Sequence, residues 1–519
     1  MDSSSTRQYS REDVALHNKK GDLWVVIDSK VFDLSKFANL HPGGLAVLLD
    51  KSIAGKDATE AFFGLHRFDV LQRPQYARLQ IGVIGDETPS RFPREDGALS
   101  MVPYAEPAWL TEGLVSPYYK DHHRAFQKET RKLVDKIIFP DAQAVQENGE
   151  KPSQHVFDEM TKVNLNAMRL GPGEHLKGRT LMNGTVTPEQ FDYFHELILF
   201  LETTRLHARG YHDGLAGGTA ICLPIIANFA RQDIRERVLN EIFDGKKLAC
   251  LAISEAYAGS DVSKIQTNAR KTKDGKHWIV NGTKKWITNG NFADYFVTAC
   301  ATDKGLNVLL IERGEGVATR HVDTGYGHSA GTAYITFDDV QVPVEHTLGP
   351  EGGGLNVILS NFNHERWGIA ASTLGAQRMI VEECMKWAAQ RKVFGRPLNS
   401  QPIIRSKLAA MIIRIETAQA WLEHITYQMA NMNFKQDSSR IAGQIALLKV
   451  HCSQSAQETA RDAVQIFGGR GLTKTGMGKY IQRYTNAVMF DSILGGTEDV
   501  LGDLGVRLAI KQIPRNSLL

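Results

Sequence analysis

The sequence predicts a multidomain protein: a small α+β domain followed by a helical region, a β-rich region and a second helical region. A chain of 519 residues is too long for a single hydrophobic core. Short strand-like runs such as Leu23–Ile27 occur near the N-terminus. Apolar residues then recur with helical spacing, change to strand-like stretches with turns near residue 250, and return to helical spacing near residue 355.

These changes in pattern define five expected segments. Residues 86–104 are polar and rich in proline, which is typical of a linker with some reach. We therefore expect a compact domain at 5–85, this linker, a helical domain at 105–247, a β domain at 248–352 and a helical domain at 353–519.

Several stretches are long or regular enough to be assigned individually. Strands are expected at Trp278–Thr283 and Leu306–Glu312, where β-branched and aromatic residues cluster between turns. Helices are expected where apolar residues recur every three to four positions. They are Gln190–Leu206, Asp233–Phe243, Leu355–Gln390, Ile404–Asn431 and Ser438–Phe467.

Composition excludes several classes of function. A net charge of +3 without a dense basic run gives no reason to expect nucleic acid. No apolar run approaches the ~18 residues that a membrane helix requires. The five cysteines contain no CxxC pair and are expected to be reduced thiols. Acidic residues among the first 30 argue against a secretory signal or a transit peptide, so we expect a cytoplasmic or peroxisomal protein.

Two histidines in the first domain are candidates for binding one metal atom together. His41 opens the Pro-Gly turn His41–Gly44 (HPGG), and His66 is the only histidine between residues 42 and 121. Two surface histidines beside a Pro-Gly turn would also explain these residues. With Val31–Phe37 and Asp57–Phe62 (DATEAF), however, the segment resembles the cytochrome b5 haem module. This resemblance implies haem b with His41 and His66 as its axial ligands, which leaves the iron no open position and favours electron transfer.

A second signature spans the rest of the chain. It consists of Ser254–Asp261 (SEAYAGSD), Trp286–Gly290 (WITNG), Arg391–Gly395 (RKVFG) and Gln465–Gly469 (QIFGG). Each motif alone would fit a buried tryptophan or a glycine turn. In this order they resemble the acyl-CoA dehydrogenases. The resemblance implies a helical domain, a middle β-barrel or sandwich and a C-terminal four-helix bundle. It also implies FAD, an acyl-CoA substrate and a homodimer or homotetramer.

The resemblance also assigns cofactor contacts. Ser254 should bond the pyrimidine side of the flavin, and Ser260 should contact the substrate or the pyrophosphate. Trp286 should pack on the ring, with Thr288 near its reactive edge. The other residues matched to the cofactor are Thr497 and four that reach the FAD of a neighbouring subunit, namely Arg391, Phe394, Gln465 and Gly469.

The catalytic base is the point at which this chain departs from many family members. Removing an α-proton from a thioester needs a carboxylate whose pKa is raised by exclusion of water. Where many members have this glutamate, the chain has Gly495. In the isovaleryl-CoA and long-chain members the base lies instead before an arginine, and here that position is Glu365, before Arg366. Arg366 would then lie near the CoA moiety.

Other interpretations of these acidic residues remain open. Glu365 could be a solvated helix residue paired with Arg366 or Lys386, and Glu498 and Asp491 are weaker candidates for the base.

We therefore expect FAD-dependent α,β-dehydrogenation of an acyl-CoA, with Glu365 as base and the Gly495 N–H polarising the thioester oxygen. Reduced flavin would pass single electrons to the fused haem and onward to an electron-accepting protein. The alternatives are an acyl-CoA oxidase, a nitroalkane-type flavin oxidase of the same fold, and a non-catalytic flavin- and haem-binding protein.

Overall fold

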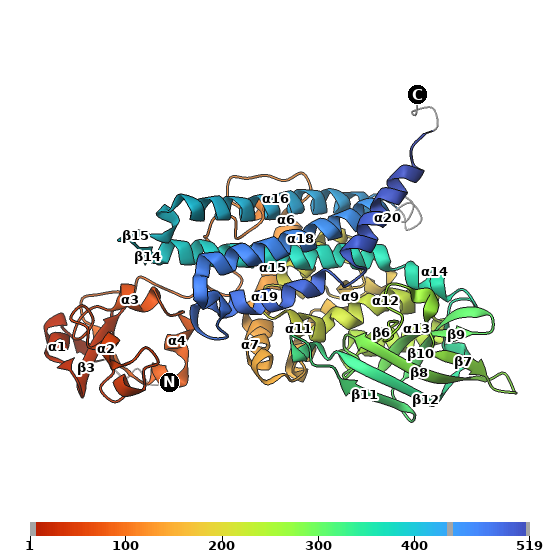
Figure 1. The fold of residues 1–519 in the computed structure, drawn as a ribbon, viewed down its shortest axis with the longest axis horizontal. Coiled ribbons are helices and arrows are strands. Elements are labelled where there is room, and N and C mark those ends of the chain that lie inside the picture. The colour runs from red at the N-terminus through yellow and green to blue at the C-terminus, as the bar shows by residue number, and fades with distance from the viewer. Residues whose placement is uncertain (1–6, 433–439, 515–519) are drawn as a thin grey trace. The chain divides into compact units, whose positions relative to one another are not determined.

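The computed structural model describes residues 7–432 and 440–514, which divide into two compact units (Figure 1). The first comprises Met1–Glu95 together with Cys384–Ser406 and Ile466–Tyr480. The second comprises Asp96–Glu383, Lys407–Gln465 and Ile481–Leu519. The two C-terminal segments of the first unit were not anticipated from the sequence. No helix in the described part of the chain is long and apolar enough to cross a membrane.

The first unit is built on a small sheet with the strand order β1-β5-β4-β3-β2. β1 pairs parallel with β5, and the other pairs are antiparallel. Asp28 and Ser29 close the β3–β4 hairpin, both with positive φ, as a two-residue turn between right-twisted strands requires. The strands are β1 (Gln8–Tyr9), β2 (Asn18–Lys19), β3 (Asp22–Ile27), β4 (Lys30–Asp33) and β5 (Gln80–Ile84).

Short helices pack on both faces of this sheet: the first packs Val14 against Val26 and Val31, and later helices complete a larger apolar core on the other face. Leu23, Val25 and Phe32 of the sheet pack with Leu48 and Phe63 of the helices. The helices are α1 (Arg11–Leu16), α2 (Leu45–Leu48), α3 (Thr59–Phe63), α4 (Asp69–Gln72) and α5 (Pro74–Ala77).

The segment 86–104, expected to be a linker, is anchored at each end. The Asp28 carboxylate accepts hydrogen bonds from Ser90 N–H, Ser90 Oγ and Arg91 N–H within the first unit. Within the second unit, Gly97 N–H donates to Asp135 and Ser100 Oγ donates to Glu382. Both ends of the expected linker therefore belong to folded units.

The second unit begins with a helical region around a buried ion cluster. Arg131 is 1% exposed and binds two buried carboxylates, Glu106 (NH1–Oε1 2.5 Å) and Glu202 (Nε–Oε2 2.7 Å). Burial alone would raise the pKa of Glu106, but Arg205 and Arg131 lower it to about 2. The main helices here are α6 (Asp121–Leu133), α7 (Phe139–Asn148), α8 (Gln154–Lys162), α9 (Leu165–Met168), α10 (Tyr193–Thr203), α11 (Arg209–His212), α12 (Gly218–Phe229) and α13 (Gln232–Phe243).

Two of these helices test the sequence assignments. α13 starts one residue before the expected Asp233–Phe243. α10 is shorter than the expected Gln190–Leu206. Asp192 is its N-cap, because the side chain accepts from the N–H groups of Phe194 and His195, so the helix cannot extend further back.

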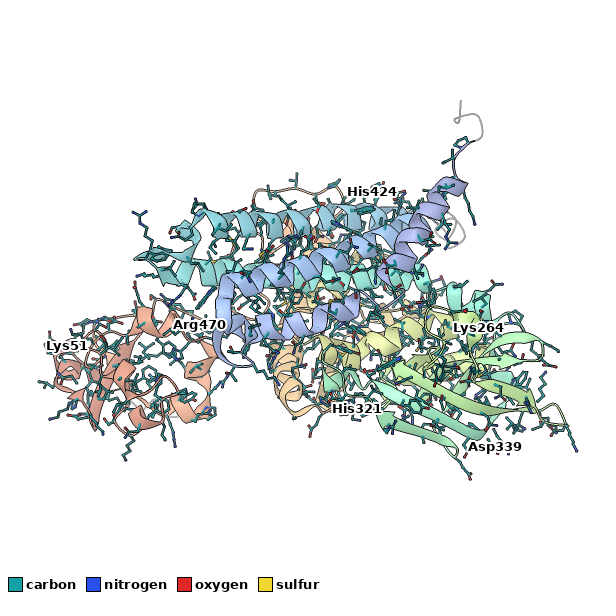
Figure 2. All side chains as sticks on the ribbon, in the orientation of Figure 1. Lys51, Lys264, His321, Asp339, His424 and Arg470 are labelled. Carbon is teal, nitrogen blue, oxygen red and sulfur yellow. The ribbon has the colours of Figure 1, made fainter. Side chains whose placement is uncertain are left out.

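The middle of the unit is an eight-stranded sheet in the order β11-β12-β8-β7-β9-β10-β13, with β6 paired to β9. Asp339 lies in a bulge of β12 that is held by two hydrogen bonds with the Asn281 side chain. Asp339 and Lys264 are both exposed in this region (Figure 2). The strands are β6 (Ala249–Ala252), β7 (Asn268–Lys271), β8 (His277–Ile287), β9 (Tyr295–Thr302), β10 (Gly305–Glu312), β11 (Val317–His321), β12 (Ala333–Pro343) and β13 (Thr347–Leu348).

Long helices form the last region. The expected helix Leu355–Gln390 is in fact two, α14 (Gly354–Leu359) and α15 (Phe362–Gln390). The break lies at Asn361, whose side-chain amide donates to Ile221 O of α12 at 2.7 Å. The others are α16 (Pro402–Ala430), α18 (Ala442–Phe467), α19 (Lys479–Asp491) and α20 (Glu498–Lys511). The expected start of α18 at Ser438 lies outside the described residues.

The buried ion cluster yields a stability prediction. Arg131→Met should lower the free energy of unfolding by about 3–5 kcal/mol, because the buried Glu202 would lose the cation that it binds and Glu106 would keep only the 3.7 Å contact with Arg205. Arg507→Met removes an exposed pair with Asp503 and should change it by less than about 1 kcal/mol. Denaturant titrations followed by circular dichroism compare the two variants, and equal losses would contradict the prediction.

Candidate active site

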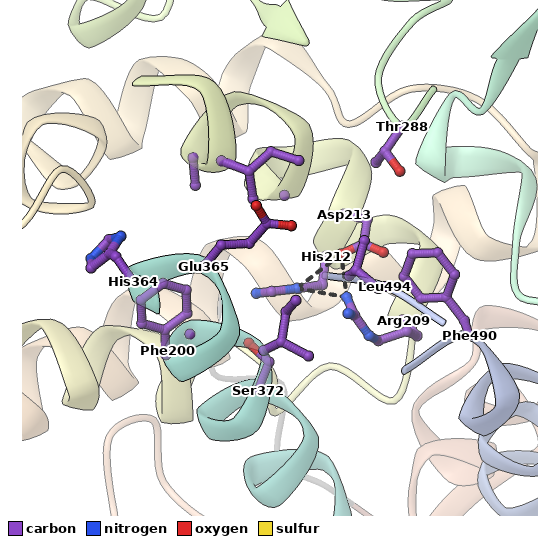
Figure 3. Close-up of a pocket in the computed structure, with 15 residues that line it drawn as sticks. Phe200, Arg209, His212, Asp213, Thr288, His364, Glu365, Ser372, Phe490 and Leu494 are labelled. Carbon is purple, nitrogen blue, oxygen red and sulfur yellow. Dashed lines mark hydrogen bonds and ion pairs between the residues drawn. The ribbon is translucent and has the colours of Figure 1, made fainter. Parts of the chain in front are cut away.

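A cavity in the second unit lies among α10, α11, α12, α15 and the 490–494 segment (Figure 3). Glu365 and Thr288 both line it, so two residues predicted for the site from distant parts of the sequence share one cavity. Its lining residues are Phe200, Arg209, His212, Asp213, Gly217, Ala220, Ile221, Thr288, His364, Glu365, Gly368, Ile369, Ser372, Phe490 and Leu494.

Glu365 is a buried carboxylate in the first turn of α15. It is 8% exposed, and its Oε2 has no hydrogen-bond partner among the described residues. Burial raises the pKa of Glu365 to about 7, because removal of water disfavours the charged form. The neighbouring Arg366, His364 and Lys449 act in the opposite direction but do not cancel this effect.

Gly495 approaches this carboxylate so closely that no side chain fits there. A Cβ at Gly495 would lie 2.6 Å from Ile369 Cδ1 and 3.6 Å from Glu365 Oε1, and the residue has a φ of +67°. Both the space and the backbone therefore require glycine. The structure thus brings together the two residues predicted to be catalytic.

Two buried cations hold the loop that contains Gly495. Arg366 Nε donates to Gly495 O at 2.9 Å, and Lys449 Nζ donates to Gly496 O at 2.9 Å. Burial lowers the pKa of Lys449 to about 8. Arg366, predicted to lie near CoA, is 9% exposed and is engaged here by the loop. Thr497, predicted to contact the cofactor, follows as the half-buried N-cap of α20.

The predicted flavin contacts of the β domain also meet. Ser254 O accepts the N–H of Lys285, which places the half-buried Ser254 beside Trp286. Trp286 is 54% exposed and has a φ of +68°, a strained conformation for an aromatic residue. A flat apolar side chain held outward in this way fits a planar ring. Ser260 lies in an exposed loop.

Of the nine predicted cofactor contacts only Thr288 lines the cavity, and four of the others lie in two segments near the ends of α15 and α18. Arg391 directly precedes β14 (Lys392–Val393). Phe394 lies in the turn between β14 and β15 (Arg396–Pro397) and is 94% exposed. Gln465 and Gly469 are exposed near the end of α18. None of the four lines the cavity.

The first unit holds the two predicted haem ligands close together, with their rings tilted by 54°. The ring centroids of His41 and His66 are 6.0 Å apart. With metal–nitrogen bonds of about 2 Å and each centroid about 1 Å behind its nitrogen, one metal atom needs roughly this separation. Phe37, Phe62 and Phe68 are among the apolar side chains around them.

Local contacts prepare both rings for this task. His66 Nδ1 donates to Phe62 O at 3.1 Å, which leaves Nε2 free as a ligand atom. Burial lowers the pKa of both histidines, so the neutral, ligand-competent form is favoured. A Cβ at Gly43 would lie 2.8 Å from His41 Cε1, and Gly44 has a φ of +82°, which explains the two glycines of the turn. The residues therefore fit a bis-histidine haem.

Sequence analysis missed a polar group on the cavity wall. Arg209, His212 and Asp213 belong to α11 and to the π-helical turn Asp213–Gly217 that follows it. The only local signal is the spacing of four between Arg209 and Asp213, which would ordinarily indicate a surface ion pair.

Comparison with known proteins matches almost every part of the chain to a family. The matching models are cytochrome b5-like heme/steroid binding domain (residues 10–85) and the acyl-CoA dehydrogenase N-terminal (120–246), middle (250–340) and C-terminal (352–508) domains.

Individual relatives agree with this assignment. Acyl-CoA dehydrogenase apdG of Emericella nidulans is 36% identical over 80% of this chain and 96% of its own. Acyl-CoA dehydrogenase AFT10-1 of Alternaria alternata is 34% identical over 80% and 98%. The structure of butyryl-CoA dehydrogenase from Megasphaera elsdenii has a TM-score of 0.66 and 26% identity over 76% of this chain and all of its own.

These matches confirm the predicted fold class, the activity class of an oxidoreductase, and FAD and haem as the cofactors of the two parts. The chain belongs to the acyl-CoA dehydrogenase family and carries a cytochrome b5-like domain ahead of the three dehydrogenase domains.

Proposed function

We propose that this enzyme removes the α and β hydrogens of an acyl-CoA thioester with Glu365 as the base, and that the fused haem receives the electrons. The observation that carries this proposal is the buried, unpaired Glu365 carboxylate, whose raised pKa is close to neutrality, in the same cavity as Thr288. A base with a pKa near the working pH combines a large ionised fraction with strong proton affinity.

The walls of the cavity support proton abstraction by keeping water away. Phe200, Ile221, Ile369 and Leu494 surround Glu365 with apolar surface. Glu365 Oε2, which lacks a partner, is free to accept the α-proton. In this apolar setting an interaction with developing charge is stronger than it would be in water.

Gly495 is proposed to polarise the thioester oxygen through its backbone N–H. The bonds from Arg366 and Lys449 to the carbonyls of Gly495 and Gly496 fix this loop before substrate binds. Donors fixed in advance need no reorganisation during the reaction. Arg366 would act mainly by holding the loop, with contact to CoA as its second role.

The cofactors would be held by the residues already placed. FAD, when bound, supplies the acceptor for the β-hydride. Ser254, Ser260, Trp286, Thr288 and Thr497 would hold it. Residues of a neighbouring subunit in a homodimer or homotetramer would complete its site, namely Arg391, Phe394, Gln465 and Gly469.

His41 and His66 would hold the haem iron from both sides. Haem, when bound, would supply a one-electron acceptor. A separate protein would then take the electrons onward.

Anaerobic mixing with a panel of acyl-CoAs, recording flavin and haem absorbance together, tests the whole proposal. Flavin bleaching followed by haem reduction supports it. A haem that stays oxidised while the flavin bleaches removes the electron-transfer part. Rapid peroxide formation in air would favour an acyl-CoA oxidase, and silence with every thioester would exclude dehydrogenation.

Loss of the proposed base gives the first prediction. Glu365→Gln should lower kcat by roughly 100- to 10,000-fold, because no carboxylate remains to take the α-proton. FAD content, measured by absorbance, should stay normal. Glu498→Gln is the matched control, since Glu498 is half-buried, does not line the cavity and accepts from Ser453 Oγ at 2.6 Å. Equal turnover of the two variants would remove Glu365 as the base.

The pH dependence gives the second prediction. Because the pKa of Glu365 is raised to about 7 and the base must be ionised, kcat/KM should rise with pH through about 7 and level off above it. The raised pKa also means that folded-state stability is lost as pH rises from the ordinary carboxyl range toward 7. Glu365→Gln should therefore melt at a higher temperature than the wild type at pH 8. A rate that is flat from pH 5 to 9 would contradict the assignment.

Haem ligation gives the third prediction. His66→Ala should abolish the absorbance spectrum of low-spin haem while substrate still bleaches the flavin, because the two cofactors occupy separate sites. His17→Ala is the control, since His17 pairs with Asp22 and stacks on Trp24 in the same domain. A low-spin spectrum in the His66→Ala protein would show that another ligand serves the iron.

A further inference from the structure

One wall of the active-site cavity is charged, although the other walls are apolar. Arg209, His212 and Asp213 line it from α11 and the turn that follows, and Ser372 lines it from α15 (Figure 3). His212 is 7% exposed and Asp213 is 3% exposed. Burying such groups is unfavourable unless they are paired, so a cavity for a plain alkyl chain would not be expected to contain them.

Arg209 is fully used by two carboxylates. Its NH1 donates to Asp213 Oδ1, and its Nε and NH2 donate to Asp491 Oδ1 at 3.2 and 3.0 Å. The guanidinium also lies 5.2 Å from the centre of the Phe490 ring. Asp491 is also attracted by the buried Lys449, so Asp213 is the carboxylate of this group that lines the cavity.

Asp213 keeps one oxygen unpaired. Its Oδ2 is buried and has no hydrogen-bond partner among the described residues. A buried acceptor in this state loses its hydration without compensation. Because Asp213 lines the cavity, a ligand in the cavity can supply the missing donor.

Neighbouring side chains approach Asp213 without bonding to this oxygen. His212 Nδ1 lies 3.6 Å from Asp213 Oδ1, the other oxygen, and 3.3 Å from an Arg209 nitrogen, and its Nε2 lies 3.4 Å from Thr203 Oγ1. The hydroxyl of Tyr326 bonds with Thr332 Oγ1 at 3.1 Å.

We propose that the acyl group oxidised by this enzyme carries a hydroxyl on the part of its chain beyond the reacting carbons, and that Asp213 Oδ2 accepts its hydrogen bond. This inference rests on the proposed function and names the substrate class for the same site. The Asp213 carboxylate disfavours an acyl group that ends in a carboxylate, because like charges repel. The apolar walls, including Phe200, Ile369 and Phe490, would pack on the carbon chain between the thioester and the hydroxyl.

Such a site should discriminate strongly between acyl groups with and without the hydroxyl. A buried acceptor left unpaired by an analogue without the hydroxyl penalises that analogue, whereas an apolar pocket separates similar chains only weakly. We expect at least a tenfold higher kcat/KM for the preferred hydroxyacyl-CoA than for the unsubstituted chain of equal length.

The first test uses the wild-type holoenzyme. Pentanoyl- and hexanoyl-CoA are compared with their 4-hydroxy and 5-hydroxy derivatives and with glutaryl-CoA. A preference of tenfold or more for one hydroxylated isomer, with glutaryl-CoA the poorest, supports the inference. Preference for the unsubstituted chains overturns it while leaving the dehydrogenase proposal intact. If no thioester is oxidised, the proposed function itself fails and the inference falls with it.

The second test assigns the preference to one oxygen. Asp213→Asn keeps the shape but weakens the acceptor, and should reduce the preference at least tenfold. Asp491→Asn makes the same change to the other partner of Arg209, which does not line the cavity, and should leave the preference ratio unchanged. FAD content and melting temperature monitor folding.

Two results of the second test would overturn the assignment. Asp213→Asn could bind FAD more weakly and yet show an unchanged hydroxyl preference when assayed with excess FAD, in which case the flavin is the partner of Asp213. Equal loss of preference in both variants would show that Arg209, not Asp213, controls it. If Asp213→Asn does not fold, the wild-type panel alone decides whether the hydroxyl is recognised.

Discussion

A carboxylate buried without a counter-charge is the constraint around which the active site is arranged. Glu365 keeps Oε2 unpaired inside an apolar cavity, and this loss of hydration raises its pKa. The arrangement is unfavourable for stability and is maintained by the surrounding fold. Gly495 leaves space for the carboxylate, while Arg366 and Lys449 are turned toward backbone carbonyls instead of neutralising it. Had either cation paired with Glu365, its pKa would be low and its affinity for a proton weak.

The haem site is organised by different means. His41 and His66 are positioned mostly by contacts close in sequence, namely the turn through Gly43 and the bond from His66 Nδ1 to Phe62 O. The contacts that orient the two rings therefore come mostly from the same small domain. The active site instead draws on α10, α11, α12, α15 and the 495 loop, which are more than 100 residues apart at their extremes.

The two sides of the cavity have opposite physical character. The side of Ile221, Ile369 and Leu494 offers dispersion contacts and excludes water, which a carbon chain needs. The side of Arg209 and Asp213 carries fixed charge and an unsatisfied acceptor. A uniformly apolar cavity separates chains mainly by length, whereas one unpaired acceptor recognises a particular group at a particular distance.

The sequence by itself determined the features that depend on neighbours along the chain. The glycines of His41–Gly44 are required by local approach and by positive φ, and the limits of α13 follow from its own periodicity. Glu365 could be assigned from its place before Arg366. Only the tertiary structure decided the helix break at Asn361, which depends on a bond to α12, and the engagement of Arg366 by Gly495. It also decided the charged wall at Asp213, because burial of an arginine–aspartate pair spaced by four has no local signature. Local propensity acts over a few residues, whereas burial and pairing are set by segments that meet only in the folded chain.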